Sequence, residues 1–484
     1  MTAASPRILD VLPEDILLTV FGFLSLNDIL KMRQVSSTFG ALTHARGLWT
    51  DLLHRYVIGE GLPIPKLQEE LRGDPVAIRT TIPDNLDTAA LERCIRRALT
   101  LRRAWTSPSP KPARHLVVSV QEECLESSAW RIVSLHFCGH FLLSVSFTSV
   151  SPPERERLPL VFRSWDLRQR KPRCVSSMFV PFRSSFKWNT GLRKGRDDPV
   201  LAVVPSNDFE TKFYGLDADG EFQLMSTSAS TADLRALHGT TVLTRHGMGD
   251  TCVWDMRDTQ SHCVLKNPQS EQPETFVATH LHGRFLLIVW TRALQIFDLS
   301  GKHTPDKDGK HAIVEALAHW RWPWPIDSAR ATTLHTSLAS DDPPPFHIFL
   351  RFSSFLPWPV NMLHHYLLSP STEPDTPAYA LPPRAVVSIP SHVRLFSVSD
   401  MALGSYGAAV WIDSATEDED TGKRLAGTIL QEPSTKEPEG HAQVTTFDKT
   451  SSRETEPWLH VEVDDEEGRI AVASFGQFEL YEFI

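Results

Sequence analysis

The chain has 484 residues and a formal net charge of −10, so we do not expect a surface that binds nucleic-acid phosphates. Its six cysteines are scattered without a Cys-x-x-Cys pair, which argues against a zinc site and a disulfide-held secreted fold. No apolar run approaches the roughly 18 residues of a membrane span, and the charges between Arg7 and Asp15 exclude a signal peptide. We expect a soluble protein in the cytoplasm and/or the nucleus, with no nucleic-acid or membrane partner.

The stretch LPEDILLTVFGFL, at residues 12–24, predicts a short helix with a broad apolar surface. Pro13 suits the first helical position, where its missing N–H costs nothing. Glu14 and Asp15 then face the positive end of the helix dipole. The predicted apolar face exceeds what one core contact needs; its side chains are Ile16, Leu17, Val20, Phe21 and Leu24, with Leu18 and Phe23 beyond it.

Three more short helices are predicted before residue 57. Ser25 and Asp28 fit a capping box at the start of SLNDILKMRQV, although Asn27 or Asp28 could cap instead. The segments STFGALTHA and GLWTDLLHRY follow. Helices this short bury little by themselves, so the surplus apolar surface either packs on the rest of the chain or receives a partner. The residues alone leave both possibilities open.

The order of these residues resembles an F-box, the adaptor-binding motif of ubiquitin-ligase substrate receptors. The resemblance rests on the Leu-Pro opening, the acidic pair before Ile16, the Phe23–Leu24 pair and the closing Trp49. It implies a small all-α domain at 7–56 that binds a Skp-family adaptor and, through the adaptor, a cullin. The adaptor-binding residues that the resemblance implies are Leu12, Pro13, Ile16, Leu17, Val20, Phe21, Phe23, Leu24, Leu26, Leu30, Val35 and Trp49.

A linker region is predicted at 57–113, with a basic amphipathic helix at 86–105. Apolar residues fall at four-residue steps in LDTAALERCIRRALTLRRAW, and Asp87 or Thr88 can cap its start. A membrane-surface or calmodulin-type target is conceivable for such a helix, but we favour a connecting helix docked between two domains. The stretch TSPSPKPA at 106–113 then marks a domain boundary.

Residues 114–484 predict an all-β unit, because short β-type runs replace helical periodicity. Several runs end in Trp-Asp or a related pair, at intervals of about 40 to 50 residues apart from two longer intervals with irregular inserts. The unit therefore resembles a degenerate WD-repeat β-propeller with about seven blades. The markers of its blades are Trp165, Leu216, Trp254, Phe297, Tyr366, Trp411 and Tyr481. The predicted fold class is thus α+β multidomain: a small all-α F-box, a connecting helix and an all-β propeller.

The two ends of this unit are predicted to meet. A propeller hides its sheet edges by closing its ring. The run GQFELYEFI stops where an outer strand should follow, while residues 116–120 precede the first marker. We therefore predict that 116–120 supplies the missing outer strand of the last blade.

No motif for catalysis, a cofactor or a metal ion is present. His136, Cys138 and His140 alternate along one strand, but satisfied core or turn residues are a simpler interpretation than a metal site without a fourth ligand. Trp322 and Trp324, in HWRWPWP, lie among prolines that disfavour a central strand. These two tryptophans either pack between blades or form an aromatic surface, and they are the candidate substrate-binding residues.

Three functions fit these observations. The resemblance implies the substrate-recognition subunit of a Skp–cullin–F-box ubiquitin ligase, in which the F-box binds the adaptor and the propeller binds an unknown protein substrate. An F-box scaffold would bind the adaptor without promoting ubiquitin transfer. An enzyme with its active site in the propeller channel would need convergent carboxylates or histidines, for which no motif is found. We favour the non-catalytic receptor.

Overall fold

The computed structural model divides the chain into two compact units, residues 1–103 and 104–484, and each is described by itself. Residues 7–11 of the predicted F-box and residues 65–85 of the predicted linker fall outside the described residues. The described residues are 12–64, 86–120, 130–148, 159–181, 184–191, 198–206, 210–229, 232–245, 249–266, 274–300, 304–305, 312–334, 342–353, 361–371, 378–391, 400–414, 423–430, 444–448 and 458–484.

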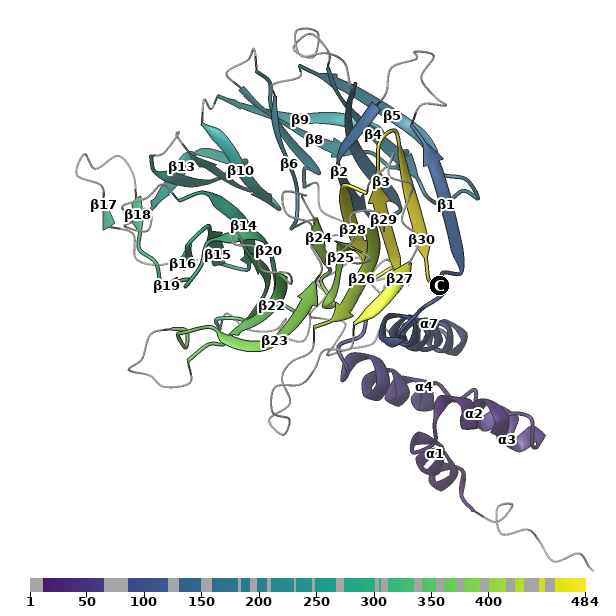
Figure 1. Cartoon of the computed structure of the whole chain (residues 1–484). Coiled ribbons are helices and arrows are strands. Elements are labelled where there is room, and N and C mark those ends of the chain that lie inside the picture. Colours follow the sequence, from purple (N-terminus) through teal and green to yellow (C-terminus); the bar gives the residue numbers. More distant parts are fainter. Residues whose placement is uncertain are drawn as a thin grey trace, which may run out of the picture. The chain divides into compact units, whose positions relative to one another are not determined.

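The described part of the first unit is helical, as predicted (Figure 1). None of the helices in the described ranges is both long enough and apolar enough to cross a membrane. The helical segments are α1 (Glu14–Gly22), α2 (Leu26–Met32), α3 (Ser37–Leu42), α4 (Arg46–Leu53), a π-helix η2 (His54–Ile58) and α7 (Thr88–Thr106), of which the residues up to Arg103 belong to this unit.

Side-chain caps fix where these short helices begin. Ser25 accepts a hydrogen bond from the Asp28 N–H (3.3 Å), which is one half of the predicted capping box, and its hydroxyl donates to the Asp28 carboxylate (2.7 Å). Hydrogen bonds from Ser25 and Lys31 lower the pKa of Asp28. Asp87 accepts from the Ala90 N–H at 2.6 Å, which confirms it as the cap of α7. Pro13 is the N-cap of α1, one residue earlier than predicted.

The helical unit has one apolar core, and α7 contributes to it. Leu17 and Phe21 of α1 are buried there, together with Trp49 of α4. Leu91 and Ile95 of α7 are fully buried in the same cluster. The first part of α7 is therefore not a separate linker element but a structural part of the helical unit.

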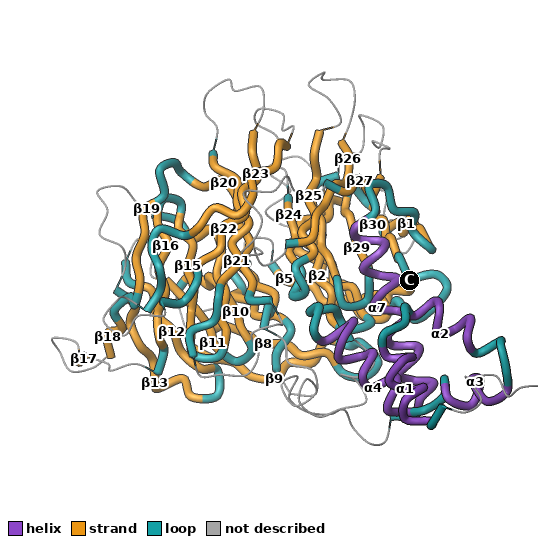
Figure 2. The backbone as a smooth tube through the Cα atoms, turned by 90° about the horizontal axis from the view of Figure 1, so that it is seen from below, coloured by secondary structure: helices purple, strands orange, loops and turns teal. Residues whose placement is uncertain are grey.

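The second unit contains seven β-sheets arranged around a centre, the seven-bladed propeller predicted from the sequence (Figures 1 and 2). The strands of the first three blades are β2 (Trp130–Cys138), β3 (Phe141–Thr148), β4 (Leu160–Asp166) and β5 (Arg173–Val180); β6 (Ser185–Trp188), β7 (Leu201–Val204), β8 (Glu210–Leu216) and β9 (Phe222–Ala229); and β10 (Asp233–His238), β11 (Thr241–Arg245), β12 (Thr251–Asp255) and β13 (Asp258–Leu265).

The remaining blades repeat the same antiparallel order. Their strands are β14 (Phe276–His282), β15 (Phe285–Trp290), β16 (Ala293–Asp298) and β19 (Ala318–Arg321); β20 (Ile326–Thr332), β21 (Phe346–Phe352), β22 (Asn361–Leu368) and β23 (Arg384–Ser391); β24 (Met401–Leu403), β25 (Ala408–Ser414), β26 (Lys423–Ile429) and β27 (Thr445–Asp448); and β28 (His460–Asp464), β29 (Arg469–Ala473), β30 (Gln477–Glu482) and β1 (Arg114–Ser119).

The first strand of each blade lies on the inside of the ring. Strand β6 contacts β10, β10 contacts β14, β14 contacts β20, β20 contacts β24, and β28 contacts both β24 and β2. Figure 1 shows these strands toward the middle of the propeller and the fourth strands at its rim. The first strands therefore form the inner wall.

The ring closes through the last blade, as predicted. Strand β1 pairs antiparallel with β30, in a register that places Leu116 opposite Leu480. Trp165 of the first blade packs edge-on against Phe478 of the last blade, with ring centroids 5.2 Å apart. The Trp165 indole N–H also donates to Ser144 at 2.9 Å, so this buried ring keeps its hydrogen bond. A strand from each end of the second unit thus completes one sheet.

Two details of the repeat differ from the prediction. Six of the seven markers lie on the third strand of a blade, but Trp411 lies on β25, a second strand. The insert between β16 and β19, predicted to be irregular, forms β17 (Thr304–Pro305) and β18 (Ala312–Val314). Strand β18 pairs in parallel with β13, so this insert extends the third blade.

Candidate functional site

A row of exposed apolar side chains runs along α1. Ile16, Val20 and Phe23 are spaced by four and three residues, which places them on one side of the helix. Their exposed fractions are 45%, 47% and 74%. Leu12, just before the helix, is exposed as well, and so is Val35 after α2. We call Ile16, Val20 and Phe23 the apolar row.

The opposite side of α1 is anchored in the helical core. Leu17 and Phe21 are buried, and the Phe21 ring meets the Phe39 ring edge-on, with centroids 5.6 Å apart. At the C-terminal end of α1, Arg55 donates a 2.8 Å hydrogen bond to the Gly22 carbonyl, and its guanidinium lies 5.8 Å from the Phe23 ring centroid. The helix that carries the apolar row is therefore held in place on its buried side and at its C-terminal end.

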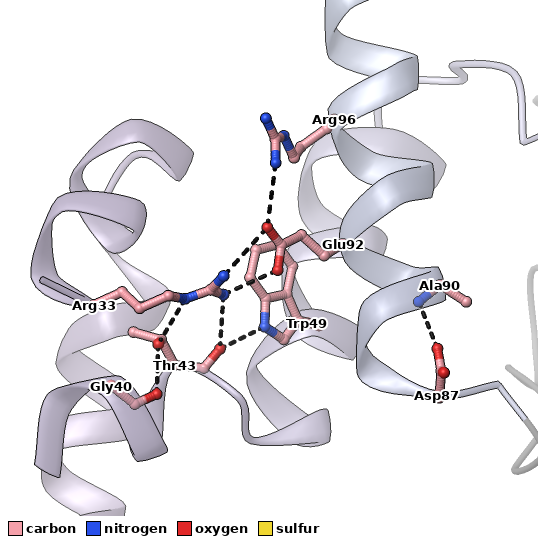
Figure 3. Close-up of polar contacts among 8 residues, drawn as sticks. All are labelled: Arg33, Gly40, Thr43, Trp49, Asp87, Ala90, Glu92 and Arg96. Carbon is pink, nitrogen blue, oxygen red and sulfur yellow. Dashed lines mark hydrogen bonds and ion pairs between the residues drawn. The ribbon is translucent and has the colours of Figure 1, made fainter. Parts of the chain in front are cut away.

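A polar network around Arg33 joins the remaining helices of the unit (Figure 3). Arg33 pairs with Glu92 of α7 at 2.9 Å and donates to the Thr43 hydroxyl at 3.1 Å. The Thr43 carbonyl accepts a 2.7 Å hydrogen bond from the Trp49 indole. Glu92 also lies 3.5 Å from Arg96. Glu92 lies 59 positions from Arg33 in the sequence, so no local pattern predicts this pair.

The predicted adaptor-binding residues divide by burial. The exposed ones are Leu12, Pro13, Ile16, Val20, Phe23 and Val35, and the half-buried ones are Leu24, Leu26 and Leu30. Leu17, Phe21 and Trp49 are buried in the core. The prediction that these three residues contact the adaptor directly is therefore corrected. Their side chains pack in the core of the helical unit and present no surface to a partner.

Of the two candidate tryptophans in the propeller, only one is on the surface. Trp322 is 6% exposed and packs against Tyr366, with ring centroids 5.1 Å apart, so it belongs to the core between the fourth and fifth blades. Its prediction as a binding residue is therefore corrected. Trp324 is 63% exposed. Trp322 is buried and Trp324 is exposed although they are only two positions apart, because both lie in an irregular loop and not on a regular strand.

The loop that presents Trp324 has a fixed backbone. The Trp322 N–H donates to the Arg292 carbonyl at 2.9 Å, and the Ile326 N–H donates to the Thr291 carbonyl at 2.6 Å. The Pro325 carbonyl accepts from Ser353 at 2.7 Å. Trp324 is thus an aromatic side chain held out from a hydrogen-bonded loop.

Of the three residues predicted to alternate along one strand, His136 and Cys138 lie on β2, whereas His140 lies in the turn after it. His136 stacks on Trp188 and lies 3.4 Å from Glu462, and burial raises the pKa of the Cys138 thiol to about 11. Among the residues that the structure describes, no three His, Cys, Asp or Glu side chains are grouped to hold a metal ion.

The helical arrangement and the seven sheets define the class of protein: an F-box-like domain combined with a β-propeller. Residues 9–55 match the family described as F-box-like. No curated protein is significantly similar to the chain in sequence.

Among solved structures, the WD40 domain of SCAP from fission yeast is 12% identical, with a TM-score of 0.41 over 76% of this chain and 98% of that one. A chain of a humanized mutant of the Chaetomium thermophilum Polycomb Repressive Complex 2 is 9% identical, with a TM-score of 0.45 over 77% and 97%. Drosophila Semaphorin 1b is 8% identical, with a TM-score of 0.41 over 77% and 87%.

Proposed function

We propose that the protein is the substrate-recognition subunit of a Skp–cullin–F-box ubiquitin ligase. The observation that carries this proposal is the apolar row of α1, which lies within the F-box-like domain. F-box domains generally bind Skp-type adaptors, and the adaptor would connect this chain to a cullin. In this role the chain holds a target and performs no catalytic step of its own.

The energetics of the apolar row favour a partner. Side chains of this size gain roughly 1.5–3 kcal/mol each when they leave water completely. Ile16, Val20 and Phe23 keep about half or more of their surface in water, so much of that gain is still available. Because Phe21 and Arg55 already hold the helix, little further ordering is needed on binding.

The propeller is the proposed site for the target. A receptor must hold its adaptor and its target at the same time, so the two surfaces have to be separate. Trp324 is suited to contact a target, because tryptophan supplies a large contact area for little lost side-chain freedom. The proposed location is cytoplasmic and/or nuclear.

The test is adaptor capture by the full chain carrying Val20→Ala and Phe23→Ala. Both side chains are exposed, so circular dichroism should show an unchanged fold. If each side chain is an interface anchor worth roughly 1–4 kcal/mol, adaptor affinity should fall at least about tenfold. Phe179→Ala is the matched control, because Phe179 is an exposed aromatic residue of the propeller. Undiminished capture by the double variant would refute the assignment.

A reconstituted ubiquitin-transfer assay separates a receptor from a scaffold. With adaptor, cullin and bound target present, the receptor should promote ubiquitin transfer, and the double variant should not. A chain that captures the adaptor but never joins a cullin would be a scaffold.

A further inference from the structure

The last blade of the propeller ends in an outer strand that no further strand covers among the described residues. Strand β1 lies at the end of its sheet, which has the order β1-β30-β29-β28. An edge strand presents main-chain N–H and C=O groups with which another extended chain can pair. Val117, in the middle of β1, is 53% exposed. The β1 edge is therefore a surface to which a partner could add a strand.

The main-chain groups of Val117 point away from the sheet. The Val120 N–H donates to the Gly476 carbonyl at 2.8 Å, and β1 pairs with β30 in an unbroken antiparallel register. Hydrogen-bonded and non-hydrogen-bonded pairs alternate along such a ladder. Val118 therefore bonds to β30, whereas the N–H and C=O of Val117 face outward and are available to another chain.

Strand β1 lacks the features that protect the other outer edges. The ladders of β5, β9, β13, β23 and β27 each contain a register shift, whereas the ladder of β1 is regular. Strand β19 is regular too, but it has only four residues and ends in Arg321. Residues 116–119 of β1 carry neither a charge nor a proline. This edge is thus regular and uncharged over most of its length.

The third blade shows how an outer edge of this propeller is covered. Strand β18 pairs in parallel with the part of β13 beyond its register shift, with Ile313 beside Val264. The Lys266 N–H donates to the Val314 carbonyl at 3.0 Å, and the Val314 side chain is buried in the core. The added strand has the uncharged sequence Ala-Ile-Val. A short extended segment with β-branched residues is therefore able to extend a blade.

We propose that the β1 edge binds an extended, uncharged segment of the protein target, which adds a strand to the last blade. This inference rests on the proposed function, because it gives the chemistry of a segment that the propeller holds. The segment is uncharged and rich in β-branched residues, as β18 is, because it pairs with residues 116–119. Arg114 and His115, at the start of β1, already lie 3.1 Å from Glu482 and 2.9 Å from Glu479, so they do not favour a charged segment.

The probe for this edge is a fluorescein-labelled peptide with the sequence Ser-Ala-Ile-Val-Ser-Thr. It is titrated into the full chain and followed by anisotropy. The control is the same peptide with N-methyl groups on the main-chain nitrogens of Ile and Val. This control keeps the side chains and loses main-chain donors, so it should bind much more weakly than the unmodified peptide.

Two substitutions of Val117 test the edge in the protein. Val117→Pro removes an outward N–H and leaves the ladder with β30 intact, so peptide binding should weaken roughly two- to tenfold. Val117→Lys should weaken binding as well, because a lysine on an edge opposes strand addition. If Val117→Pro lowers the melting temperature, Val117→Lys decides, since it replaces an exposed side chain. Leu224→Lys is the matched control and should bind as wild type, because Leu224 is 55% exposed on the irregular outer strand β9.

Equal binding by wild type and folded Val117→Lys, equal binding of the N-methylated peptide, or no binding by wild type would overturn the proposal. A wild-type dimer that Val117→Lys converts to a monomer in sedimentation would assign the edge to a second copy and overturn the target segment as its occupant. Adaptor capture is measured on the same samples. Loss of peptide binding with intact adaptor capture concerns this edge alone, whereas failed adaptor capture by wild type concerns the proposed function.

Discussion

Replacing Trp105 with alanine should destabilise the propeller. The sequence placed the start of this unit at residue 114, but the second unit begins at Ala104. Trp105 is 5% exposed, and its ring lies 5.1 Å from the Phe447 ring and 5.5 Å from the Phe483 ring. Its carbonyl accepts a 3.0 Å hydrogen bond from Thr445. The last turn of α7 is thus part of the propeller core.

The expected loss follows from these contacts. Removing a buried tryptophan side chain costs about 3–5 kcal/mol, including the cavity that it leaves. The two aromatic pairs supply about 0.5–1.5 kcal/mol each within that figure. The hydrogen bond from Thr445 is retained in Trp105→Ala, because it uses the backbone carbonyl. Trp324→Ala is the control and should change the free energy of unfolding by no more than about 0.5 kcal/mol, since Trp324 is exposed.

The assay is urea unfolding of the full chain, followed through the β-sheet signal in circular dichroism. This signal reports the propeller and does not depend on tryptophan fluorescence, which both substitutions change. The midpoint should fall clearly for Trp105→Ala and stay in place for Trp324→Ala. Equal midpoints for the two variants would show that the aromatic contacts of Trp105 do not stabilise the propeller, and the unit would then start at residue 114.

Deleting residues 114–119 should lower the melting temperature of the propeller strongly, because β30 loses its partner strand; a normal melting curve would contradict ring closure. Phe21→Ala should cost the helical unit about 3–5 kcal/mol in chemical denaturation, whereas Phe23→Ala should leave its stability unchanged, and the reverse order would refute the division by burial. Burial raises the pKa of Asp465 to about 7, although the Tyr406 and Ala408 N–H groups donate to its carboxylate. Since the unfolded pKa is near 4, wild type should lose unfolding free energy relative to Asp465→Asn as the pH rises from about 4 to 7, in parallel denaturation series.

The parts of the fold that depend on local chemistry were predictable from the sequence. Ser25 with Asp28 marks a helix start because a capping box needs only neighbouring residues. Trp165 and Trp254 lie next to the last residue of third strands, as the repeat predicts. The pairing of β1 with β30 was also predictable, because an open ring would leave a strand edge unpaired.

Features that depend on distant contacts were not predictable. Trp411 lies in the middle of a second strand, and the residues around it resemble those that mark third strands elsewhere, so the pattern cannot tell the two apart. Ile16 and Phe21 are both apolar residues of one helix, and only their neighbours decide which of them is buried.

The closure of the ring by β1 and β30 has a consequence for synthesis of the chain. Arg114 and Glu482, which pair across these strands, are separated by 368 positions. At about 5–20 residues per second, translation takes roughly 20–70 s to produce the second strand after the first. During this interval β1 has no partner, and its free edge is open to other nascent chains or to chaperones. The helices up to residue 103 have left the ribosome long before, so the two units mature at different times.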